Sequence, residues 1–125
     1  MSTVEINSLV LAYLGDTVYE NYFRSFLIGL GINNVDLLQK KAVNYVSAKS
    51  QAKYLKEMIE NNILTAGEIA IVKRARNCKC NSHPKSCDIT TYKNATGLEA
   101  LLGYLKLEND DKRIKEIMNY IIGGN

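Results

Sequence analysis

The sequence predicts an all-α fold, a helical bundle. Apolar residues recur at three- and four-residue steps through most of the chain, and no segment shows the alternation of a half-buried strand. One proline among 125 residues also argues against a turn-rich β design. With 46% hydrophobic residues, the chain has enough apolar material for one core, and it is too short for two comfortable domains. We therefore expect a single domain over residues 1–125.

The first helix is expected over residues 8–28 and ends at Gly29-Leu30-Gly31, because glycine readily adopts the left-handed conformation that closes a helix. Apolar side chains cover almost its whole circumference: Leu9, Val10, Leu11, Tyr13, Leu14, Val18, Tyr19, Tyr22 and Phe23. Such a helix needs more than one covering surface. A central position in a monomer and a dimer interface both explain the pattern.

The next two helices are expected over residues 33–46 and 48–62, with Ser47 capping the second of them. The predicted inward face of the earlier helix is Leu37, Leu38, Val43 and Val46. That of the later helix is Ala48, Ala52, Leu55 and Ile59. Both sets follow helical spacing, so each helix should present one apolar side to the core.

Three further helices complete the bundle. Thr65 and Glu68 have the spacing of a capping box for a helix over residues 66–76. A helix over residues 94–107 carries a leucine stripe, and a last one starts at Asp110 or Asp111 and ends at Gly123-Gly124. The stripe consists of Leu98, Leu101, Leu102 and Leu105.

A long irregular stretch, residues 77–92, coincides with a concentration of positive charge. Between Lys73 and Lys93 there are six Lys or Arg residues and one acid, Asp88. Long connections in compact domains tend to be functional, and clustered cations are the footprint of a polyanion. We expect this region to contact nucleic acid; a solvated basic loop is the alternative.

The same stretch holds the pattern C-x-C-x2-H-x3-C. Its four side chains could bind a structural zinc, but the spacing is not a common zinc pattern, and we expect free, reduced thiols. Their positions are Cys78, Cys80, His83 and Cys87. Three cysteines cannot complete a disulfide framework, no apolar run is long enough for a membrane span, and no signal-like segment opens the chain. We therefore expect a cytoplasmic protein without a membrane association.

Asp16 and Glu99 are acids on faces of small residues. Asp16 directly follows Gly15. Small residues also flank Glu99 at helical spacing: Ala95, Thr96 and Gly103. Two helices that pack through such faces could bring the acids together, and the pair would then need a cation such as Mg²⁺ between them. The alternative is two boundary acids that each point to water.

Two segments resemble the ribonuclease III family. "LAYLGDTVYE" (residues 11–20) is similar to the signature helix L-E-F-L-G-D-A-V-L, and "ATGLEALLGYLKL" (residues 95–107) is similar to the second motif, A-D-x-F-E-A-L-I-G-A-x-x-L. The resemblance is closest to the compact Mini-ribonuclease III branch, which lacks a double-stranded-RNA-binding domain. "VSAKSQA" (residues 46–52) and "KRARN" (residues 73–77) resemble stretches of that branch. The resemblance to this family implies a ribonuclease III-like catalytic domain that works as a homodimer.

The resemblance implies that Asp16 and Glu99 are catalytic and coordinate the metal. Two further acids of the family pattern are replaced here, by Ala12 and Thr96, so we expect one well-held Mg²⁺, for which Mn²⁺ can substitute. Glu20, one turn after Asp16, is expected to be a surface or interface acid.

The implied activity is metal-dependent endonucleolytic cleavage of double-stranded or structured RNA, leaving 5′-phosphates, and the implied task is maturation of precursor 23S ribosomal RNA. The RNA contacts are expected from seven residues: Lys73, Arg74, Arg76, Asn77, Lys79, Lys85 and Lys49. A non-catalytic, ribosome-associated RNA-binding module on the same fold is the competing interpretation, favoured by the two absent acids. A purely structural helical dimeriser would leave the basic region unexplained.

Overall fold

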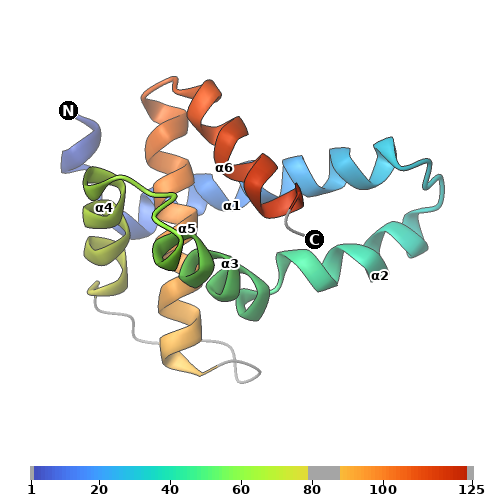
Figure 1. Cartoon of the computed structure of the whole chain (residues 1–125), viewed down its shortest axis with the longest axis horizontal. Coiled ribbons are helices and arrows are strands. Elements are labelled where there is room, and N and C mark those ends of the chain that lie inside the picture. Colours follow the sequence, from blue (N-terminus) through green and yellow to red (C-terminus); the bar gives the residue numbers. More distant parts are fainter. Residues whose placement is uncertain (1, 79–87, 124–125) are drawn as a thin grey trace.

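The computed structural model describes residues 2–78 and 88–123. In the described residues, a short 3₁₀ turn, η1, precedes six α-helices, and one of these, α5, is central (Figure 1). The elements are η1 (Thr3–Glu5), α1 (Ser8–Gly29), α2 (Val35–Val46), α3 (Ala48–Glu60), α4 (Ala66–Arg76), α5 (Ile89–Leu107) and α6 (Asp111–Gly123). The described residues contain no strand, so the predicted all-α class is confirmed. None of the helices in this part of the chain combines the length and apolar character needed to cross a membrane.

Most helix boundaries lie where they were predicted, because side chains near each boundary cap the helix. Ser47 accepts a hydrogen bond from the backbone N–H of Ser50, and Thr65 and Glu68 form the complete capping box of α4. Asp110 accepts a hydrogen bond from the backbone N–H of Arg113 at the start of α6. After α1, Gly31 has a φ of +93°, which is the left-handed conformation expected there.

The start of α5 was predicted wrongly. The helix begins at Ile89 rather than at residue 94, because the Asp88 side chain caps it and accepts a hydrogen bond of 2.8 Å from the backbone N–H of Thr91. The β-branched residues Ile89, Thr90 and Thr91 have modest helix propensity and concealed this extra turn. The irregular connection is therefore shorter than residues 77–92.

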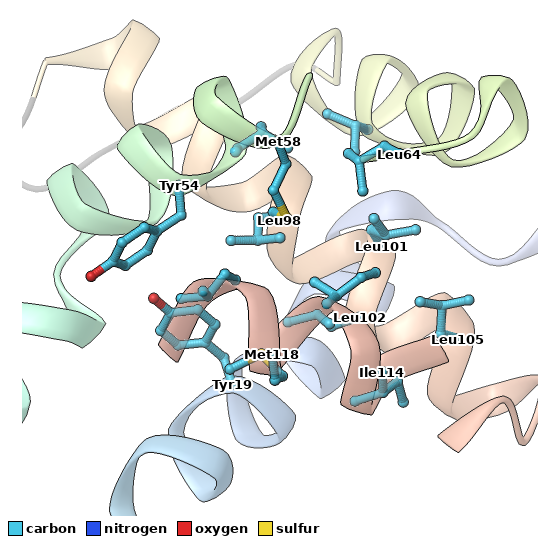
Figure 2. Close-up of a cluster of buried hydrophobic side chains, with 14 of the residues drawn as sticks. Tyr19, Tyr54, Met58, Leu64, Leu98, Leu101, Leu102, Leu105, Ile114 and Met118 are labelled. Atoms are coloured by element: carbon cyan, nitrogen blue, oxygen red, sulfur yellow. The ribbon is translucent and has the colours of Figure 1, made fainter. Parts of the chain in front are cut away.

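The core forms around α5, and its leucine stripe is buried as predicted. Tyr19 comes from α1, Met58 from α3, and Ile114 and Met118 from α6; these side chains surround Leu98 and Leu102 in Figure 2. Burial of one such side chain contributes about 1.5–3 kcal/mol to stability. Helix α5 is thus the element on which α1, α3, α4 and α6 pack.

The inward faces of α2 and α3 differ from those predicted. On α2, Leu37 and Val43 are exposed, because this helix pairs with the end of α1 away from the central helix (Figure 1). On α3, Leu55 is buried, but the rest of its buried face is Gln51, Tyr54 and Met58. Ala48, Ala52 and Ile59 are half-buried. The buried face of α3 therefore includes polar residues, and apolar spacing alone did not indicate it.

A half-buried ion pair ties α4 to α6. Arg113 donates hydrogen bonds of 2.7 Å from Nε and from one terminal nitrogen to the two oxygens of Glu68, and it also donates to the carbonyl oxygen of Ile63. Burial alone would raise the pKa of Glu68, but the Arg113 hydrogen bonds and the backbone N–H of Thr65 lower it below its ordinary value. The pair holds the ends of two helices that pack on α5.

Candidate active site

Helices α1 and α5 cross with their backbones in direct contact. A Cβ atom on Gly15 would collide with the carbonyl oxygen of Glu99, and one on Gly103 would collide with the carbonyl oxygen of Leu11. Two glycines therefore allow a separation that no other residue at these positions permits. This close approach is the one expected for Gly15 from the sequence.

The crossing brings Asp16 and Glu99 together. The Asp16 side chain is exposed and hydrogen-bonds the half-buried carboxyl group of Glu99. Burial, followed by the hydrogen bond and the charge of Asp16, raises the pKa of Glu99 to about 8. A pKa near 8 keeps a proton on Glu99 at neutral pH, which avoids two adjacent negative charges in this pair.

Gln51, which the sequence analysis did not select, completes the surroundings of Glu99. It is buried on α3, and its amide Nε2 donates a 3.4 Å hydrogen bond to Glu99 Oε2. This bond favours the ionised form of Glu99, whereas the nearby charge of Glu20 opposes it. Gln51 lies within "VSAKSQA", and a polar residue on the inward side of an amphipathic helix was the signal that could have indicated it.

The carboxyl pair fits a hard divalent cation. Two carboxyl groups in contact provide the oxygen ligands that Mg²⁺ or Mn²⁺ prefers, and a bound cation would offset the burial and the Asp16 charge that raise the pKa of Glu99. Glu20 pairs with Arg24 across 3.1 Å on the surface of α1, consistent with the surface acid expected from the sequence.

Ala12 and Thr96, which replace two further acids of the family pattern, are both buried. Ala12 is buried in a small apolar cluster with Leu11, Ala75 and Ala100. Thr96 is buried as well, and its hydroxyl donates a 2.9 Å hydrogen bond to the carbonyl oxygen of Tyr92. Neither position offers an oxygen ligand comparable to a carboxylate.

The predicted RNA contacts lie in different environments. Lys49, Lys73 and Asn77 are exposed, and Arg76 is half-buried. Arg74 donates hydrogen bonds to Ser8 Oγ (2.9 Å) and to the carbonyl oxygen of Ile6 (3.0 Å), so it also connects α4 to the start of α1.

Most of the other residues predicted to act in the basic stretch lie outside the described part of the chain. These are Lys79, Lys85, Cys80, His83 and Cys87. Cys78 is half-buried and has a free thiol. Among residues 2–78 and 88–123, no cluster of three or more His, Cys, Asp or Glu side chains could hold a metal ion.

Comparison with known proteins identifies the family of the chain. Residues 9–110 match the Ribonuclease III domain family. The chain therefore belongs to the ribonuclease III family, and it is an endoribonuclease.

Its relatives place it in the compact branch of that family. Mini-ribonuclease 3 from Enterococcus faecalis is 42% identical over 94% of this chain and 89% of that protein, and Mini-ribonuclease 3 from Brevibacillus brevis is 45% identical over 90% and 82%. A crystal structure of a protein from Fusobacterium nucleatum superposes with a TM-score of 0.84 and 37% identity, covering 94% of this chain and 93% of that one. The resemblance drawn from the two motifs is confirmed.

Proposed function

We propose that this chain hydrolyses phosphodiester bonds in double-stranded or structured RNA, with a divalent metal ion held by Asp16 and Glu99. The observation that carries the proposal is the contact between these two carboxyl groups at the crossing of α1 and α5. Enzymes of the ribonuclease III family act on double-stranded RNA and generally depend on a divalent metal, which supports the assignment.

A bound Mg²⁺ would supply a nucleophilic water near neutral pH and stabilise the leaving oxygen. The protein's own part is positional. The backbone contact at Gly15 fixes the distance between the two acids, and Gln51 orients Glu99 while favouring its ionised form. Asp16 is exposed, so a phosphodiester of a bulky duplex can reach this pair from solvent. Products would carry 5′-phosphate and 3′-hydroxyl ends.

We propose that the RNA backbone contacts Lys73, Arg76, Asn77 and Lys49, with Lys79 and Lys85 of the connecting segment. A-form duplex is recognised mainly through phosphates and 2′-hydroxyls, so cations on the surface are suited to it. Arg74 remains in this set, although its guanidinium already bonds within the protein.

We propose a homodimer that forms through the N-terminal half of α1. Leu9, Val10 and Tyr13 share one face of this helix and are 40%, 57% and 82% exposed. Exposed apolar side chains grouped in this way favour a protein partner. Asp16 follows one turn later on the same side, so a second copy would approach close to the catalytic pair and place two active sites on one duplex.

For the natural substrate we propose precursor 23S ribosomal RNA in the cytoplasm, as the likeness to Mini-ribonuclease 3 proteins implies. The purified chain should cut such a precursor at discrete positions in a paired region, and mapping of the new 5′ ends would locate them. Uniform degradation or cutting confined to single-stranded segments would contradict this substrate.

The activity itself is tested by incubating the protein with a long RNA duplex in Mg²⁺ and, in parallel, in EDTA. The proposal requires cutting in Mg²⁺ alone. Binding of the duplex without cutting in either buffer would instead establish the non-catalytic RNA-binding module, which the acids missing at Ala12 and Thr96 favour.

A further inference from the structure

An open groove of about 580 Å³ lies where α3, the end of α4 and the first turns of α5 meet. These three segments approach one another in Figure 1 at the end of α5 where that helix begins. Lys49, Lys53 and Lys56 line it from α3, Arg76 from α4, and Asn94 from α5. We call it the lysine groove.

The groove concentrates the positive charge of the molecule. Its lining has four cations and one acid, Glu60, so its surplus of three charges equals the net charge of the whole chain, +3. Glu60 only weakly offsets this surplus, because its contact with Lys56 is 3.9 Å long and both side chains are well exposed. The groove therefore attracts a polyanion.

The lysines are placed where they reduce the stability of α3. Lys49, Lys53 and Lys56 follow each other at four- and three-residue spacing, so like charges face each other along one side of the helix. Lys49 also lies in the first turn of α3, which contains no acid, and a cation at a helix N-terminus opposes the helix dipole. These lysines therefore lower the stability of α3 when no ligand is bound, and an anion in the groove would offset this cost.

The groove and the proposed catalytic pair both involve helices α3 and α5. Asn94 lies five residues before Glu99 on α5, which corresponds to about 7.5 Å along the helix axis. On α3, Gln51 contacts Glu99 from one side of the helix, while Lys49 and Lys53 face the groove from the other. An RNA strand that reaches both the pair and the groove would therefore run past the first turns of α5.

We propose that the lysine groove binds the sugar–phosphate backbone of the RNA strand beside the cleaved bond, through Lys49, Lys53 and Lys56. This inference rests on the proposed function and extends it, because it assigns backbone binding to the described face of α3 in addition to the basic connection after α4. Lys49 and Lys56 are seven positions apart, about 10 Å along the helix axis, so the three lysines can contact more than one phosphate. They supply sequence-independent affinity.

The test compares two double variants of equal charge change. Lys53→Gln with Lys56→Gln removes two cations from the groove. Lys112→Gln with Lys115→Gln removes two exposed cations with the same spacing from α6. Binding to a fluorescent RNA duplex is measured in EDTA at several salt concentrations, and cleavage is measured separately in Mg²⁺.

The groove variant should raise the KM for duplex RNA several-fold with kcat unchanged. It should also lower the slope of log K against log salt by about 1.8, which is about 0.9 for each of the two lost phosphate contacts. Glu60→Gln removes the acid of the lining and should tighten binding. Circular dichroism and the melting temperature confirm that each variant is folded.

The proposal is overturned when the groove variant matches the α6 variant in both KM and salt slope. It is equally overturned when kcat falls while binding is unchanged. Failure of the proposed function has a different signature, since the wild type would then show no Mg²⁺-dependent cutting, whereas the salt slopes in EDTA would still report on the groove.

Discussion

The backbone of Gly15 lies directly against the carbonyl group of Glu99, eighty-odd residues later in the chain. This contact, repeated by Gly103 against Leu11, brings the acid that follows Gly15 into hydrogen-bonding contact with the Glu99 side chain. The geometry of the proposed catalytic pair is thus a consequence of helix packing rather than of any loop.

Gly15→Ala and Gly103→Ala should therefore be strongly destabilising. Each added methyl group would meet main-chain atoms that cannot rotate away, so the helices must separate, at a cost of about 3 kcal/mol or more. Urea unfolding measures the loss. Gly29→Ala is the control, because it lies at the end of the same helix with nothing within 4 Å, and it should be neutral or slightly stabilising. Equal effects of Gly15→Ala and Gly29→Ala would refute the close packing.

Metal affinity should depend on pH through Glu99. Its pKa of about 8 lies above the ordinary value, so a proton occupies the carboxyl group at neutral pH and must leave when a cation binds. Affinity should rise by up to about tenfold per pH unit until pH 8 and then level off. Calorimetric titration of the wild type with Mn²⁺ across this range measures the effect. Glu99→Gln should lose the dependence together with most of the affinity; a pH-independent wild type would contradict the assignment.

The ion pair between Glu68 and Arg113 should make stability fall in acid. Because the folded-state pKa of Glu68 is lowered, its contribution is present above the ordinary carboxyl pKa of 4.5 and is lost as pH falls through the lower folded value. Glu68→Gln should cost about 2 kcal/mol at neutral pH and have a flatter acid profile. Melting temperatures of both proteins from neutral pH downward provide the comparison, and parallel profiles would exclude this role for the pair.

Tyr13→Glu should convert the proposed dimer to a monomer. A charge at an 82% exposed position costs a monomer little, but it would be buried without a partner in the interface. Light scattering after gel filtration should give the mass of one chain, 14.0 kDa. Val35→Glu, which adds the same charge at another exposed apolar residue, should leave the dimer intact. A Tyr13→Glu protein that stays dimeric would place the interface elsewhere.

Most helix boundaries could be predicted because they depend on neighbouring residues. The Thr65–Glu68 capping box and the Ser47 cap are complete within four residues, and the structure confirms both. The start of α5 was predicted wrongly because its cap, Asp88, precedes three β-branched residues that do not indicate a helix. The exposed face of α2 could not be foreseen, because it depends on how far α1 extends beyond α5, which is a tertiary property.

The approach of Asp16 to Glu99 could be predicted from their small neighbours, and their proposed role from the family resemblance, whereas the residues around them could not be predicted. Gln51 is polar, and periodicity assigns polar residues to the surface; its burial depends on the partner that Glu99 provides. The lysine groove is formed by residues of three helices. The spacing of its lysines on α3 can be read from the sequence, but their position opposite Arg76 and Asn94 depends on the tertiary fold.

The central claim is that Asp16 and Glu99 form one metal-dependent catalytic centre. The most direct measurement is the rate at which Asp16→Asn cuts an RNA duplex in Mg²⁺, together with its affinity for that duplex and its melting temperature. We expect the cleavage rate to fall by at least about 10³-fold with duplex binding and folding preserved, because the exposed Asp16 side chain contributes chemistry rather than packing. Cleavage by Asp16→Asn at the wild-type rate would contradict it.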